Sequence, residues 1–137
     1  MTKNRFWLKL IGLAILLHII LIALTILEVA IYSYLIAPNK DEAFYKAHAQ
    51  ISAPWISGIC GSLIIFLLVR NFIKKNDDRH LTYTIAFPLT YIAMDILMLL
   101  PLNINCSEHL PIFLMANGGK IAASFLSYFI YKKTIKK

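Results

Sequence analysis

Long apolar runs separated by short polar segments form the dominant pattern along this chain. Each run approaches the ~20 residues that an α-helix needs to cross about 30 Å of hydrocarbon. Pro111 opens the last run at the first helical turn, where proline is well tolerated. The pattern predicts an all-α membrane protein with one domain, 1–137, built from four transmembrane helices. The expected spans are about 8–36, 51–72, 81–102 and 110–131.

Short connections between the runs predict that sequential helices are antiparallel neighbours in an up-down-up-down bundle. The connection over residues 37–50 is mostly polar, with Phe44 and Tyr45 embedded in it. Asn39 is a residue type that favours a helix N-cap, so we expect a short helix lying on the membrane surface there. Residues 103–109 form the second connection expected on the same side.

Polar residues recur at helical spacing inside three of the four runs. At about 100° per residue, each set occupies one face of its helix. The second run contributes small residues to the same pattern. Polar residues facing lipid are costly, so these faces should meet in a polar bundle interior. The sets are His18, Thr25, Glu28 and Tyr32; Pro54, Ser57, Gly58 and Gly61; Thr84, Pro88, Tyr91 and Asp95; and Asn117, Lys120, Ser124, Ser127 and Tyr131.

Composition and charge distribution agree with a membrane location. Hydrophobic residues make up 59% of the chain and charged residues only 15%, against about a quarter charged in a soluble domain. The net charge of +7 does not indicate nucleic-acid binding, because 11 of the 14 basic residues flank alternate ends of the apolar runs. This positive-inside pattern predicts an N-in, C-in topology in the cell membrane, as in a bacterial inner membrane.

Three charged residues lie within the apolar runs, where charge is usually retained for function. Asp95 and Lys120 lie at similar depth on sequential antiparallel helices, and we expect them to form an ion pair. Glu28 lies further outward and has no evident basic partner in the core. The sequence therefore predicts a ligand-binding pocket that opens outward. Its expected residues are Glu28, Asp95, Lys120, Asn117, Tyr91, His18 and Tyr32.

The chemistry that the sequence lacks also narrows the function. No motif for a catalytic nucleophile, a phosphate-binding loop or a zinc site is present. We accordingly expect no cofactor and no metal. His18, Glu28 and Asp95 form a constellation that acid–base chemistry on a lipid-like substrate would use, but they match no motif.

Three functions follow from this pattern. The first is a protein that binds or transports a small, cationic or lipid-like molecule through the polar pocket. The cationic alternative rests on two core acids against one core lysine. The second is a membrane subunit or assembly factor whose polar faces only hold helices together, and the third is an intramembrane enzyme. The expected partners are membrane lipids and a small-molecule ligand, with no nucleic acid; the pattern is also compatible with a homo-oligomer.

Overall fold

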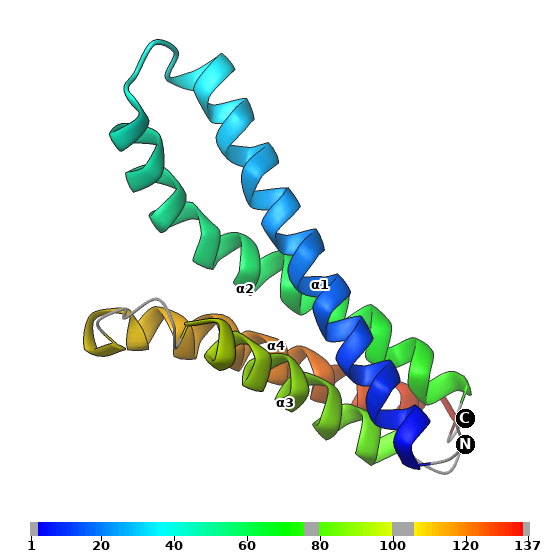
Figure 1. Cartoon of the computed structure of the whole chain (residues 1–137). Helices are drawn as coiled ribbons and strands as arrows, with labels where there is room; N and C mark the ends of the chain where they lie inside the picture. Colours follow the sequence, from blue (N-terminus) through cyan, green and yellow to red (C-terminus); the bar gives the residue numbers. More distant parts are fainter. Residues whose placement is uncertain (1–2, 76–79, 100–105, 136–137) are drawn as a thin grey trace.

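The described residues of the computed structural model, 3–75, 80–99 and 106–135, are almost entirely helical. They form two antiparallel helical hairpins (Figure 1). The first hairpin joins α1 to α2 through the π-helical segment η1, and the second joins α3 to α4. The bounds are Lys3–Ile31 for α1, Tyr32–Ile36 for η1, Glu42–Lys75 for α2, His80–Leu99 for α3 and Cys106–Ile135 for α4.

The turn between η1 and α2 is shorter than the sequence predicts. The backbone N–H of Ala37 donates to the carbonyl of Tyr32 at 2.9 Å and closes η1. Asn39 adopts a left-handed φ of 62° instead of capping a helix. The cap is Asp41, whose carboxylate accepts from the Phe44 backbone N–H at 2.9 Å.

The expected surface helix is instead the first part of α2. This helix begins at Glu42 and continues without interruption to Lys75, so it starts nine residues before the expected start of the second span at residue 51. Pro54 lies inside α2, and the helix bends along its length (Figure 1). Proline removes a backbone hydrogen bond and kinks a helix, which accounts for the bend.

The second hairpin also departs from the predicted boundaries. α4 begins at Cys106, four residues before the expected start of its span, so most of the expected 103–109 connection is helical. α3 ends at Leu99. The predicted extension of the third span to residue 102 lies outside the described residues, as do residues 103–105 of the connection.

The apolar core lies at the end of the bundle that carries both chain termini (Figure 1). α1 and α4 each pack against α2 and α3. The ring of Tyr83 stacks on Phe72 with centroids 5.1 Å apart and meets Phe6 at the same distance. The buried residues of α2 all lie from Gly61 onward. Beyond that point the two hairpins diverge toward their connecting loops (Figure 1).

The closest helix pair, α2 and α4, packs through small residues. A Cβ built on Gly58 would contact Ala116, and one built on Gly119 would lie 3.0 Å from Ser62 Oγ. A Cβ on Gly61 would lie only 2.8 Å from Cε of Lys120. These glycines therefore let the helices approach, and Gly61 leaves the space through which the Lys120 side chain passes.

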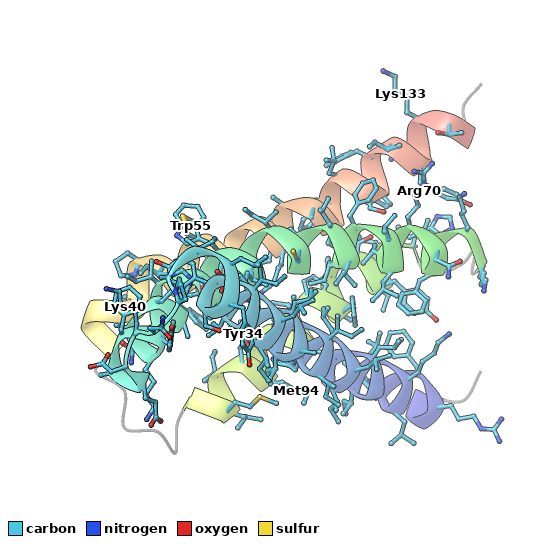
Figure 2. All side chains as sticks on the ribbon, turned by 90° about the horizontal axis from the view of Figure 1, so that it is seen from above. Tyr34, Lys40, Trp55, Arg70, Met94 and Lys133 are labelled. Atoms are coloured by element: carbon cyan, nitrogen blue, oxygen red, sulfur yellow. The ribbon has the colours of Figure 1, made fainter. Side chains whose placement is uncertain are left out.

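All four helices are long and apolar enough to cross a membrane, which indicates a multi-pass membrane protein. Large apolar side chains such as Ile19, Leu63 and Leu97 are more than half exposed on the outside of the bundle, as expected where lipid is the solvent. Figure 2 shows Arg70 and Lys133 toward the end of the molecule opposite to Lys40. Arg70 of α2 and Lys133 of α4 thus lie toward the same end of the bundle.

Candidate functional site

A cleft of about 280 Å³ lies where the two hairpins begin to diverge. α1 provides most of its wall, and α2 and α3 complete it. Its polar lining comes from His18, Thr25, Ser57, Tyr91 and Asp95. The rest of the lining is apolar and consists of Leu21, Ile22, Ile26 and Ala53. The cleft therefore has a polar floor and apolar walls.

His18 and Asp95 form a short hydrogen-bonded pair at this floor. Nδ1 of His18 donates to the carbonyl of Ala14, one helical turn earlier, at 2.7 Å. Nε2 lies 2.8 Å from Oδ1 of Asp95, a separation that requires a proton between the two atoms. Because Nδ1 already carries a proton, the pair has no net charge, whichever partner holds the shared proton. The Tyr91 ring stacks on the imidazole with centroids 4.1 Å apart and fixes its plane.

Lys120 lies behind the floor and reaches toward the pair from α4. Its ammonium donates to Ser57 Oγ at 2.8 Å and to Asn117 Oδ1 at 3.2 Å. It also lies 4.4 Å from the centroid of the Tyr91 ring, within range of a cation–π contact. Helices α2, α3 and α4 thus each contribute a group that holds this buried ammonium.

The predicted ion pair between Asp95 and Lys120 is confirmed. Nζ of Lys120 lies 3.8 Å from Oδ2 of Asp95, close enough for an ion pair but longer than a hydrogen bond. The two side chains differ in exposure, at 22% for Asp95 and 1% for Lys120. The carboxylate therefore faces the cleft, while the lysine is screened from it.

Glu28 has a basic partner that the sequence did not predict. Its Oε1 lies 2.7 Å from Nε2 of His48, and its Oε2 accepts from Ser52 Oγ at 2.8 Å. The imidazole of His48 stacks on Tyr32 with centroids 3.6 Å apart. We call Glu28, Tyr32, His48 and Ser52 the hairpin cluster, because they join α1 and η1 to the first part of α2. We expected no basic partner for Glu28 in the core, and its partner comes instead from the outer segment that begins α2.

The seven predicted pocket residues therefore fall into two groups. His18, Tyr91, Asp95, Asn117 and Lys120 come together at the base of the divergence, where His18, Tyr91 and Asp95 line the cleft and the other two lie behind it. Glu28 and Tyr32 belong to the hairpin cluster and lie outside the lining of the cleft. Ser57 is the member of the site that sequence analysis placed only among small packing residues.

If the second helix had been predicted to begin before residue 51, His48 and Ser52 could have been predicted as partners of Glu28. His48 and Ser52 are four residues apart and share a helix face. The expected boundary near residue 51 separated them, because it placed His48 in the surface segment and Ser52 in the second span. Within the part of the chain that the structure describes, no group of three potential metal-ligating side chains is present. Neither cluster therefore offers the donors of a metal centre.

Comparison of this chain with family models, with curated proteins and with solved structures gave no match.

Proposed function

We propose that this protein binds a small molecule in the cleft between its hairpins, and that the cleft opens toward the outer side of the membrane. The observation that carries the proposal is the unequal exposure of the Asp95–Lys120 pair. A carboxylate within a membrane-spanning segment costs free energy, and such residues are usually retained for function. Asp95 keeps 22% of its side chain exposed in the cleft, although a buried lysine lies beside it.

A purely scaffolding role predicts a different arrangement. In that case the polar groups would be used up in contacts between helices, as Ser124 is when its hydroxyl donates to the Thr84 carbonyl at 2.7 Å. Asp95 follows this pattern only in part, because it contacts His18 and Lys120 on other helices but still keeps 22% of its side chain exposed in a mainly apolar cleft. Ligand sites commonly combine such apolar walls with a few convergent polar groups.

Native mass spectrometry of the detergent-purified protein tests the proposal. Ala53 lines the cleft, so Ala53→Trp should fill it while leaving His18, Asp95 and Lys120 unchanged. The wild type should retain a bound molecule of defined mass, and the variant should lose it at unchanged thermal stability.

The matched control is Ile59→Trp on the same helix. Ile59 is 59% exposed on the outside of the bundle, so the added ring should enter lipid and leave the bound molecule in place. Identical spectra for all three proteins, with or without bound molecules, would contradict the proposal. They would favour a protein whose polar residues only hold its helices together.

A further inference from the structure

We infer that the cleft binds a neutral, lipid-like alcohol. Its hydroxyl head group donates a hydrogen bond to Asp95. This inference rests on the proposed function and adds the chemical class of the ligand. The class of ligand follows from the charge and the hydrogen-bonding capacity of the cleft floor, which fit cationic, anionic and hydroxyl head groups differently.

A cationic head is disfavoured by the charge already present. The His18–Asp95 pair is neutral as a unit, because its 2.8 Å contact contains a proton. Lys120, in its ammonium form, then gives the floor a net positive charge. A second cation against Oδ2 of Asp95 would lie beside the Lys120 ammonium, which is itself 3.8 Å from that oxygen. Repulsion between like charges is weakly screened at such a buried site.

An anionic head is disfavoured for a different reason. It would need free hydrogen-bond donors that reach the cleft, but both ring nitrogens of His18 already face acceptors. The Thr25 hydroxyl donates to the Leu21 carbonyl, and side-chain hydrogen bonds join the Tyr91 hydroxyl to Ser57 and Asp95. The Lys120 ammonium is directed to Ser57 and Asn117 and is screened from the cleft. The group that the cleft does expose is the Asp95 carboxyl, whose oxygens would meet the incoming anion. The positive charge of Lys120 is therefore close to the cleft but is not accessible to an anionic head group.

A hydroxyl head meets both conditions. It brings a donor and no charge. The Asp95 carboxyl has about four lone-pair sites, of which the hydrogen bonds to His18 and Tyr91 use two. The Lys120 ammonium, 3.8 Å from Oδ2, lies beyond hydrogen-bond distance, so the carboxyl can still accept from the hydroxyl. This holds whether the shared proton lies on His18 or on Asp95. A carboxyl oxygen that faces an apolar cavity is thus matched to a neutral alcohol.

The apolar wall supplies the place for the rest of the molecule. Leu21, Ile22 and Ile26 continue from His18 along α1, and eight residues of α-helix span about 12 Å. The wall runs from the polar floor toward the end where the hairpins diverge (Figure 1). A volume of about 280 Å³ accepts the head and the first part of an alkyl chain. The remaining chain extends between the hairpins into lipid.

Photo-crosslinking in phosphatidylcholine nanodiscs tests the inference. The probe is hexadecanol carrying a diazirine in its alkyl chain, and the competitors are unlabelled hexadecanol, its methyl ether, hexadecylamine and palmitate. All share the same chain, so the comparison isolates the head. Crosslinks should map to peptides containing residues 18–26 or 53–57. Hexadecanol should compete about tenfold better than the methyl ether, which is the size of one hydrogen bond made out of water.

Two variants complete the experiment. Asp95→Leu removes the acceptor and should reduce hexadecanol to the level of its methyl ether. Ala53→Trp should abolish cleft crosslinking by the probe, and it remains informative if Asp95→Leu does not fold. Hexadecylamine or palmitate competing better than hexadecanol would overturn the inference on the head group and leave the proposed function standing. Absence of cleft crosslinking in the wild type, or no effect of Ala53→Trp, would overturn both.

Discussion

Lys120 is fully buried in a membrane protein, and its neighbours explain how that is tolerated. A buried charge requires a counter-charge and satisfied hydrogen bonds. The ammonium has Ser57 and Asn117 as acceptors and the Asp95 carboxylate at 3.8 Å. Asp95 is better placed, because it is partly exposed and also bonded to His18. Lys120 therefore depends on the charge of Asp95 more than Asp95 depends on the charge of Lys120.

Removing the charge of Asp95 should destabilise the protein more than removing that of Lys120. Asp95→Asn leaves a fully buried ammonium without its counter-charge and should cost about 3 kcal/mol of unfolding free energy. Lys120→Met leaves a carboxylate that is still bonded to His18, so it should cost less than half as much. The double variant should cost less than the sum of the two. Equilibrium unfolding in detergent measures all three, and equal single costs with simple additivity would contradict the unequal dependence.

Gly61 gives a second prediction at the level of one residue. A Cβ there would lie 2.8 Å from Cε of Lys120 and 3.3 Å from Cδ1 of Leu21. Gly61→Ala should therefore displace the lysine and destabilise the protein by about 1–3 kcal/mol, as overpacked cores do. Gly118 on α4 has open space around it, so Gly118→Ala should be neutral or stabilising by up to about 1 kcal/mol. Thermal unfolding in detergent compares the pair, and similar losses for both would refute the packing argument.

Among the elements, α2 has two parts with different surroundings. From Gly61 onward it is packed into the core, whereas its first part is bound mainly to α1 and η1 through the hairpin cluster. The Tyr32–His48 stack and the Glu28–His48 contact are the points where the first hairpin is held together near its loop. Stability of that end should depend on these few contacts.

Loss of the hairpin cluster should loosen the first hairpin locally. His48→Ala removes both the partner of Glu28 and the ring stacked on Tyr32. We expect faster amide hydrogen exchange in η1 and in the first two turns of α2, with unchanged exchange around His18 and Asp95. Lys46→Ala is the matched control on the same helix, since its pair with Glu42 is highly exposed on both sides and should contribute little. Equal exchange in both variants would show that the cluster does not hold the hairpin.

Sequence analysis succeeded where one physical signal dominated. Helix number followed from hydropathy, and the Asp95–Lys120 pair followed from equal depth on antiparallel neighbours. It failed for Glu28, because a polar segment next to a membrane span does not reveal whether its helix lies on the surface or continues the span. His48 was therefore expected on the membrane surface, whereas it lies in the first part of α2. Divergence of the hairpins was equally hidden, because an apolar side chain has the same hydropathy against lipid as against another helix.

The whole molecule is a packed bundle at one end and two separating hairpins at the other (Figure 1). Aromatic and aliphatic residues fill the packed end, and the His18–Asp95–Lys120 group lies where the hairpins begin to diverge. The cleft therefore lies between the packed end and the end that carries the turn at residues 37–41. Which side of the membrane that end faces decides from where a ligand enters.

The basic residues predict that the turn between η1 and α2 faces outward. Arg70, Lys74, Lys75 and Arg79 lie between the second and third apolar runs, and such residues favour the cytoplasmic side. Single cysteines at Asp41 and Asn76, introduced after replacing Cys60 and Cys106 with alanine, test this in intact cells with a membrane-impermeant maleimide. Asp41→Cys should react, and Asn76→Cys should react only after the cells are permeabilised. The reverse pattern would turn the cleft toward the cytoplasm. A ligand would then enter from the inner side, and the proposed function would have to be revised accordingly.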